Sequence, residues 1–349
     1  MRTNLTIVFL FFLLVTKAQD IHFSQFYENS IMRNPALTGI FSGDYKAGIN
    51  YRTQWSSISA PFRTGLAIAE SKIKLNEVND HLSFGLSLIY DQAGTTSFNS
   101  LYAFPALNYN KCLTDRYNSY LSFGVTTGFV QRSVNSAKMI FSDQYQNGVY
   151  SPDQATAENI GNLKITYPDL GAGVSFNSSI GESRKVNYYI GGAAYHLNKP
   201  KIAFNSDEAY LRMPVKWNGN AGLTWIVDEH THLNIHANYS KQGINKEVIG
   251  GFLLSRRSLD MATGKKSFAV AGGVFYRLRD AWIPTFKLEY KTYTVTFSYD
   301  VNTSELNGAS NGRGGFEMSL FTKGFFDRGI WATDKTKCPR FEEMLEMGY

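Results

Sequence analysis

Glycines and asparagines crowd one short stretch of the sequence, NGASNGRGGFE, which runs from Asn307 to Glu317. Such a loop can cradle a phosphate when it lies between a strand and a helix, because the helix N-terminus then faces the anion. Here the residues from Phe316 to Leu320 alternate between apolar and polar, as in a strand. The pattern favours a turn whose Gly and Asn residues adopt positive φ over a nucleotide site.

Three histidines, His230, His232 and His236, are the nearest approach to a metal-binding cluster. In a strand His232 and His236 would lie roughly 13 Å apart, at about 3.3 Å per residue, whereas zinc binds imidazole nitrogen at about 2.0–2.1 Å. We therefore expect no metal and no cofactor. For hydrolysis, no serine lies in a G-x-S-x-G elbow, and the carboxylates of Glu342 and Glu343 lie in a C-terminal tail without an implied pocket. No catalytic residue is predicted.

Residues 1–18 have the pattern of a secretory signal peptide. Arg2 supplies a positive charge, Ile7 to Val15 is an unbroken apolar run, and Thr16-Lys17-Ala18 offers small residues at the positions that signal peptidase recognises. We expect cleavage after Ala18 and export of the mature chain. No later segment has the apolar length that a membrane helix requires.

The composition narrows the class of protein further. Of the 349 residues, 43% are hydrophobic, 15% are aromatic and only 18% are charged. Charged residues usually make up about a quarter of a soluble domain, whereas a barrel with an apolar outer belt and a polar lumen needs fewer. The net charge of +6 comes from dispersed lysines and arginines without a basic run. Nucleic acid is therefore not an expected partner.

Alternating apolar and polar residues recur from about residue 44 onward, with turn signals between the runs. A soluble sandwich and a membrane barrel share this alternation. Three features favour the barrel: segments of about ten residues, small polar residues opposite the apolar face, and aromatic residues at the ends of the apolar rows. Those aromatic residues include Tyr45, Tyr51, Tyr90, Trp217, Trp225, Tyr239 and Tyr299.

We predict an all-β fold, a transmembrane antiparallel barrel of fourteen strands in the outer membrane. An even count returns the chain to its starting side, and closure removes the sheet edges that lipid would not tolerate. The strands are expected near residues 48, 66, 86, 105, 124, 173, 190, 220, 236, 251, 273, 285, 296 and 319.

With the N-terminus in the periplasm, the longest connections fall outside the cell: Gln131 to Tyr167, His196 to Met213 and Thr303 to Gly314. The boundaries are then a signal peptide at 1–18, a periplasmic N-terminal segment at 19–42, the barrel at 43–323 and a periplasmic C-terminal tail at 324–349.

Cys112 and Cys338 are the only two cysteines. On this topology Cys112 lies at the periplasmic end of the fourth strand and Cys338 in the tail after the last strand. Both would face the periplasm, where disulfides form. We hypothesise a disulfide that pins the tail to the barrel; the alternative is two free thiols.

Several segments of the chain resemble one family. They are HFSQFYENSIMRNPALTG (22–39), INYRTQW (49–55), YRLRDAWIP (276–284), FSYDVNTSELNGASNGRGGFEMSL (297–320) and KCPRF (337–341). The chain resembles the PorP/SprF proteins of the type IX secretion system of Bacteroidetes, and the resemblance covers essentially the whole mature chain. The motif residues are Asn34, Pro35, Gly39, Tyr299, Asp300, Asn311, Gly312, Gly314, Gly315, Phe316 and Glu317. The chain departs from the pattern only in a short tail, Glu342 to Tyr349.

The resemblance implies a barrel without catalytic activity that assists secretion of large type IX substrates, or retains them at the cell surface. Such substrates include gliding adhesins with a particular kind of C-terminal domain. The implied partners are that domain, components of the secretion or gliding machinery, and outer-membrane lipid. Other family members look tied to the periplasmic machinery, and the resemblance does not choose between these roles.

The connection from Gln131 to Tyr167 is the candidate partner-binding element, because its length exceeds what joining two strands requires. It carries Phe141, Tyr145, Tyr150 and Tyr167, aromatic side chains of the kind that anchor partners. The alternative is a lid folded into its own barrel.

Two other functions stay open at this point. A porin for small solutes fits a polar lumen, although long side chains on the lumen face would also occlude the bore; these are Lys46, Arg52, Arg63 and Lys216. An outer-membrane hydrolase has no residue constellation to support it.

Overall fold

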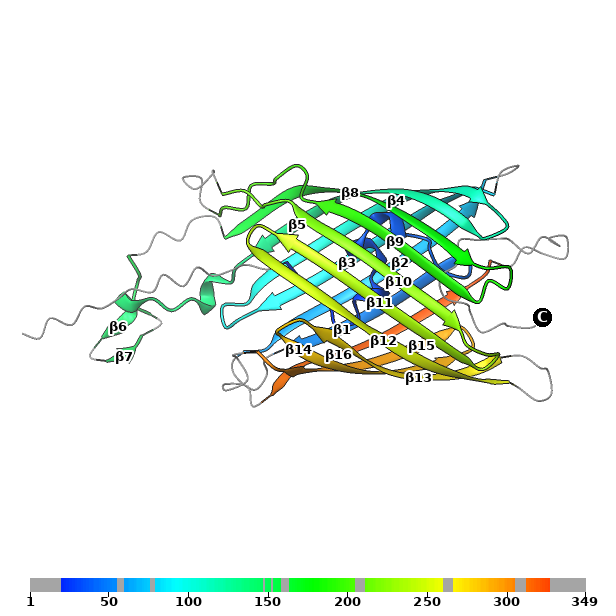
Figure 1. Cartoon of the computed structure of the whole chain (residues 1–349). Coiled ribbons are helices and arrows are strands. Elements are labelled where there is room, and N and C mark those ends of the chain that lie inside the picture. Colours follow the sequence, from blue (N-terminus) through cyan, green and yellow to red (C-terminus); the bar gives the residue numbers. More distant parts are fainter. Residues whose placement is uncertain are drawn as a thin grey trace, which may run out of the picture.

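The computed structural model describes residues 20–54, 60–75, 79–146, 148–151, 153–157, 163–204, 211–259, 266–304 and 312–326. Fourteen antiparallel strands close into a barrel, in which each strand pairs with the next one along the wall and β1 pairs with β16 (Figure 1). All fourteen predicted positions lie within these strands, so the predicted fold and strand count are confirmed. None of the helices in the described part of the chain has the length and apolar character needed to cross a bilayer.

The barrel strands are β1 (Tyr45–Gln54), β2 (Phe62–Lys74), β3 (His81–Ala93), β4 (Phe98–Thr114), β5 (Ser119–Ser133), β8 (Lys164–Ile180), β9 (Val186–Tyr195), β10 (Lys216–Ile226), β11 (Thr231–Gln242), β12 (Asn245–Leu259), β13 (Lys266–Arg277), β14 (Ala281–Tyr290), β15 (Tyr293–Asn302) and β16 (Arg313–Gly324). We call the end of the barrel that carries the connection from β5 to β8 the outer end. The opposite end, where β16 finishes, is the inner end.

Side chains alternate across the barrel wall as the sequence predicts. In β1 the side chain of Ile49 is 58% exposed and Tyr51 also points outward, whereas Asn50 and Arg52 are buried in the lumen. An apolar exterior with a polar interior is the reverse of a soluble protein, and it suits a wall that faces lipid.

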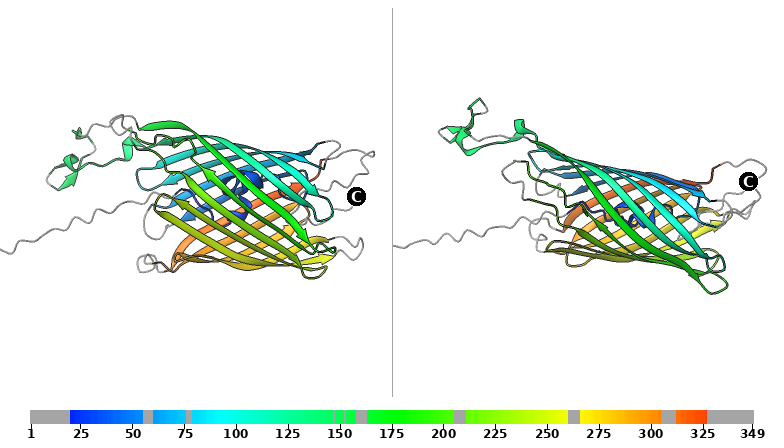
Figure 2. Two further views of the ribbon diagram at one scale, coloured as in Figure 1. Left: turned by 45° about the horizontal axis from the view of Figure 1, so that its top comes forward. Right: turned by 90° about the horizontal axis from the view of Figure 1, so that it is seen from above.

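A segment that precedes the first strand lies inside the barrel (Figures 1 and 2). It forms three short helical turns, η1 (Phe26–Glu28), α1 (Ser30–Arg33) and η2 (Pro35–Leu37). The side chain of Asn29 accepts a hydrogen bond from the N–H of Met32, and that of Asn34 accepts one from the N–H of Ala36, so asparagines cap α1 and η2. We call residues 20–44 the plug.

The position of the plug corrects the predicted periplasmic segment at 19–42. The carboxylate of Asp20 lies 3.1 Å from the ammonium of Lys216 at the outer end, whereas the N–H of Asp44 donates to the carbonyl of Gly324 at the inner end. The plug therefore runs through the lumen from one mouth to the other. A fourteen-stranded barrel is wider than wall side chains alone can fill, and strand alternation carries no information about what fills it.

Apolar side chains of the plug complete two hydrophobic clusters in the lumen. Phe23 and Ile31 join a cluster with residues of β2 to β5 and β8, and Phe26 and Tyr27 join another with residues of β12 to β14. The ring of Tyr27 stacks on that of Phe275, at 5.1 Å between centroids. The lumen is therefore packed like the core of a soluble domain rather than lined like a channel.

Two of the three predicted outer connections differ in where their described residues lie, and most of the third, Thr303 to Gly314, lies outside the described residues. The first carries η3 (Ser136–Lys138), η4 (Ser142–Gln144) and a hairpin of β6 (Tyr145–Gln146) and β7 (Val149–Tyr150), which projects beyond the barrel end (Figure 1). The connection after β9 packs into the mouth instead. Met213 and Ile202 from that connection join the lumen cluster around Phe23.

Candidate functional site: the plugged lumen

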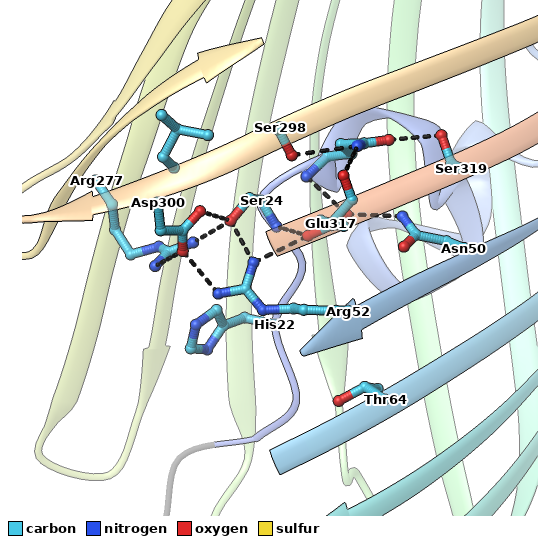
Figure 3. Close-up of polar contacts among 12 residues, drawn as sticks. His22, Ser24, Asn50, Arg52, Thr64, Arg277, Ser298, Asp300, Glu317 and Ser319 are labelled. Atoms are coloured by element: carbon cyan, nitrogen blue, oxygen red, sulfur yellow. Dashed lines mark hydrogen bonds and ion pairs between the residues drawn. The ribbon is translucent and has the colours of Figure 1, made fainter. Parts of the chain in front are cut away.

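A buried charge network holds the outer part of the plug (Figure 3). The guanidinium of Arg52 lies 2.7 Å from the carboxylate of Asp300 and 2.9 Å from that of Glu317, and all three side chains are at most 2% exposed. The plug completes this network, because the backbone N–H groups of Ser24 and Gln25 donate to Glu317 at 2.7 and 3.0 Å. Buried charges are tolerated when they are paired and hydrogen-bonded.

A second guanidinium balances the two carboxylates. Arg277, at the end of β13, lies 3.2 Å from Asp300 and donates to the hydroxyl of Ser24 at 2.8 Å. That hydroxyl in turn donates to Asp300. The side-chain oxygen of Gln25 accepts a hydrogen bond from the hydroxyl of Ser319. Four wall strands thus converge on two consecutive plug residues.

The inner part of the plug is seated on glycines. A Cβ atom placed on Gly124 of β5 would lie 2.2 Å from the backbone of Pro35 and Ala36, and one placed on Gly173 of β8 would lie 2.1 Å from the side-chain oxygen of Asn34. Contacts this short do not occur for real Cβ atoms, so only glycine lets the plug approach the wall here. The Asn34 amide uses this proximity to donate to a carbonyl of β8 at 3.0 Å.

A third cluster fixes the first described residues of the plug at the outer mouth. Asp20 lies 3.5 Å from the imidazole of His196, which lies 2.7 Å from Asp169 on its other side. Burial lowers the pKa of His196, but its hydrogen bond to Asp169 and the charges of Asp169 and Asp20 outweigh burial and raise the pKa from 6.5 to about 9. Burial raises the pKa of Asp20, yet the nearby charges of Lys216 and His196 hold it below its ordinary value.

A fourth set of contacts lies toward the inner end. Glu28 of the plug lies 3.4 Å from Lys46 of β1 and 3.4 Å from Lys287 of β14. Glu70 of β2 accepts hydrogen bonds from the N–H of Gly39, at 2.9 Å, and from a serine hydroxyl of α1. Both carboxylates therefore have partners, and each ties the plug to the wall.

Most of these polar groups bond to one another across the boundary between plug and wall, which is what a fixed internal segment requires. Among the described residues, no set of three or more His, Cys, Asp and Glu side chains is arranged to hold a metal ion. The polar groups of the lumen described above attach the plug to the wall.

A family model described as the type IX secretion system membrane protein PorP/SprF matches residues 15–321. The matched region spans the plug and nearly the whole barrel. The chain belongs to this family. It is an outer-membrane β-barrel protein of type IX secretion. No curated protein matches it.

Solved structures of outer-membrane barrels have the same general fold as this PorP/SprF chain. A monoaromatic hydrocarbon channel, the TodX deltaS2 mutant, is 9% identical, with a TM-score of 0.50 over 86% of this chain and 94% of that one. A FadL homologue of Pseudomonas aeruginosa is 10% identical, with a TM-score of 0.49 over 85% of this chain and 94% of that one. At such low identity the likeness extends to the barrel fold alone.

The predicted family-motif residues come together from opposite ends of the PorP/SprF chain. Asp300 and Glu317 bind the plug, and Asn34, Pro35 and Gly39 belong to it, with Gly39 at a φ of +81°. Tyr299 and Phe316 pair directly on the lipid-facing side. Gly314 and Gly315 lie in β16, and Gly312 lies in the turn just before it, with a φ of +76°. Asn311 lies outside the described residues.

The four aromatic residues predicted for partner binding separate into two groups. Tyr145 and Tyr150 pair across the hairpin, with ring centroids 5.8 Å apart, and Tyr145 is 51% exposed. Phe141 is half-buried just before η4. Tyr167 does not belong to the connection at all. It lies in β8, faces the lumen and is 5% exposed, so it is not available to an external partner.

The predicted cysteines, histidines and C-terminal carboxylates take no part in the contacts between plug and wall described above. The thiol of Cys112, near the inner end of β4, donates to Asp115 at 3.3 Å; Cys338 lies outside the described residues, and their disulfide stays a prediction. His232 and His236 face the lumen, whereas His230 lies in the preceding turn. The two carboxylates Glu342 and Glu343 also lie outside the described residues.

Of the four long side chains predicted to fill the bore, Lys46, Arg52 and Lys216 contact the plug. Arg63 is exposed and does not line the lumen. The network around Arg52 also includes Ser24, Gln25 and Arg277, which were not predicted. The charged residues at inward positions of the strands could have indicated this network, because a buried charge requires a partner.

Proposed function

We propose that this barrel assists secretion of a large adhesin-like type IX substrate, or anchors it at the cell surface, by binding the substrate's C-terminal domain without catalysing a reaction. The filled lumen supports this proposal most directly. A protein whose interior is occupied by its own chain offers its two ends and its outer wall to partners.

The filled lumen counts against the alternative function, an open porin. The plug spans the bore from Asp20 to Asp44, and its contacts with the wall are buried hydrogen bonds and ion pairs. The connection after β9 adds Met213 to the same packing at the outer mouth. A solute crossing the membrane through this barrel would have to displace both.

The hairpin of β6 and β7 is the proposed contact for the substrate. It stands clear of the barrel end (Figures 1 and 2). Its base is attached to the turn between β3 and β4 by Lys138, whose ammonium donates to the hydroxyl of Ser97 at 2.6 Å. Val149 and Tyr145 are among its exposed apolar side chains. Aromatic residues on a projecting element are common anchors of protein interfaces.

Purification of the tagged protein from its own outer membrane in mild detergent, followed by mass spectrometry, tests the proposal. A stoichiometric large surface protein held through its C-terminal domain is the expected result. Periplasmic machine subunits alone would favour a core-machinery role. A barrel that purifies alone and conducts ions in a planar bilayer would refute the proposal in favour of the porin.

Replacement of residues 136–157 by a Gly/Ser linker of equal length tests the hairpin itself. Loss of the copurified substrate is expected, with the barrel still folded. The matched control replaces the short inner-end turn at 181–185 in the same way and should leave capture unchanged. Equal capture by both variants would exclude the hairpin as the contact.

A further inference from the structure

The inner half of the lumen contains a cavity of about 50 Å³ between the plug and the wall. Its lining includes Arg33 of α1, Tyr189 of β9, His236 of β11, and the ammonium-bearing residues Lys46 and Lys323. Lys46 and Lys323 are opposite each other, one rung from the inner end of the β1–β16 pair. A single water needs about 10–15 Å³ of such volume, so the cavity has room for a few waters or for one small polyatomic group.

Arg33 is a buried cation that has no carboxylate partner among the described residues. It is 6% exposed, and within the described part of the chain the only hydrogen bond of its guanidinium runs to the hydroxyl of Tyr189. Aromatic faces cover it on two sides, with the guanidinium carbon 5.3 Å from the centroid of Phe26 and 5.5 Å from that of Tyr189. Its Nε is buried without an acceptor. A guanidinium has five N–H donors, so most of its donor capacity is unused.

The two carboxylates that line the cavity do not neutralise the positive charge of Arg33. Glu28 is paired with two lysines, at 3.4 Å each. Glu70 accepts from the N–H of Gly39 at 2.9 Å and from the hydroxyl of Ser30. Three cationic side chains and these two carboxylates therefore line one cavity, with an excess of positive charge at Arg33.

We propose that this cavity is a binding site for an oxyanion, a carboxylate or phosphate group, that pairs with Arg33 and enters from the inner end. Guanidinium binds both groups through two parallel hydrogen bonds. Tyr189 orients Arg33 by accepting its hydrogen bond, and its hydroxyl lies 3.3 Å from Nδ1 of His236. Lys46 and Lys323 line the approach and attract the anion to the mouth of the site. The occupant is either a small free oxyanion or the terminal carboxylate of a periplasmic protein.

Isothermal titration of the purified barrel with inorganic phosphate and with acetate, at constant ionic strength set by chloride, tests the site. Saturable binding at one site is expected for the unmodified barrel. Arg33→Gln should weaken it at least tenfold. The control Arg256→Gln removes an exposed guanidinium outside the lumen, near the inner end, and should leave binding unchanged. No saturable binding, or equal binding by both variants, would overturn the proposal.

Two further measurements complete the test. A short peptide with a free C-terminal carboxylate, compared with the same peptide amidated, separates the sources: preference for the free acid indicates a chain terminus, and binding of phosphate or acetate alone indicates a small anion. If Arg33→Gln fails to fold, crystals of the unmodified barrel soaked in selenate replace it. An anomalous selenium peak beside Arg33 supports the site, and its absence at saturating selenate refutes it. The barrel alone is measured throughout, so the outcome is independent of whether it captures a secreted substrate.

Discussion

The outer and inner halves of the plug are fixed to the wall by different physical means. Ser24 and Gln25, in the outer half, join a network of two guanidinium groups and two carboxylates contributed by four strands. Pro35 and Ala36, in the inner half, lie against strand glycines at distances that exclude a Cβ atom. The outer half is held by this charge network, whereas the inner half adds close packing against glycines to its own ion pairs and hydrogen bonds.

The difference determines how each half should respond to change. A desolvated charge network fails when one member is removed, because the remaining charges stay buried without a partner. Close packing against the strand glycines is disrupted when a side-chain atom is added, because the plug backbone cannot move away without losing its other contacts. Removal of a group should therefore damage the outer half most, and addition of a methyl group the inner half.

Replacement of Arg52 by Met is expected to have the largest effect. It keeps much of the side-chain volume but leaves the carboxylates of Asp300 and Glu317 buried without Arg52, and breaking a buried pair in this way costs about 3–5 kcal/mol. Faster hydrogen exchange in residues 20–25 and a lower denaturant midpoint should report the loss.

The control for that variant is Arg116→Met. Arg116 pairs with Glu182 on the surface, where the two side chains are 65% and 82% exposed, and such pairs contribute about 0–1 kcal/mol. Equal destabilisation by the two variants would show that the buried network does not hold the plug.

Raising the pH should release the outer end of the plug. The pKa of His196 is raised from 6.5 to about 9, so its contribution is complete below about 6.5 and is lost as the pH rises through about 9. The shift corresponds to at most about 3 kcal/mol, at about 1.4 kcal/mol per unit. Asp20, with a lowered pKa, acts in the opposite direction and contributes above its ordinary range near 3.8.

Hydrogen exchange of residues 20–23 between pH 6 and 10, corrected for the intrinsic rate, measures this release. His196→Gln should flatten the profile, because the amide cannot titrate beside Asp20 and Asp169. A profile with the same rise in both proteins would assign the pH dependence to other groups.

Addition of one methyl group at Gly124 should dislodge the inner half. Gly124→Ala places a carbon 2.2 Å from the backbone of Pro35 and Ala36, and overpacking of this kind costs about 1–3 kcal/mol. Gly219→Ala is the matched control, since no heavy atom lies within 4 Å of its Cβ position. Proteolysis of the plug should accelerate in the first variant alone. Equal resistance in both would mean that the wall yields and the glycine seat is not required.

Period-two alternation made the barrel predictable but not its contents. The apolar positions of β1, such as Ile49 and Tyr51, face outward as predicted, because each strand repeats the same rule about lipid and lumen. The plug follows no repeating rule. Its contacts join Ser24 to Asp300 across almost the whole sequence, and such pairs are set by closure of the barrel. The assignment of Tyr167 to the outer connection was wrong for a different reason. Alternation shows where a strand lies but not where it ends, and β8 begins three residues before Tyr167.

Substitutions in the hairpin of β6 and β7 should have the smallest effect on the plug. They therefore test whether the two halves of the plug are held only by contacts within the lumen. Tyr145 and Tyr150 contact each other across the hairpin, which projects away from the lumen (Figure 1). Tyr145→Ser with Tyr150→Ser should change the free energy of exchange in residues 20–44 by less than about 0.5 kcal/mol, as for surface substitutions generally.

The same double variant should weaken capture of the secreted substrate, because it removes the aromatic anchors. Loss of capture with an unchanged plug would separate recognition at the outer end from the internal structure that keeps the barrel closed. Loosening of the plug in this variant would instead show that the hairpin and the lumen are coupled.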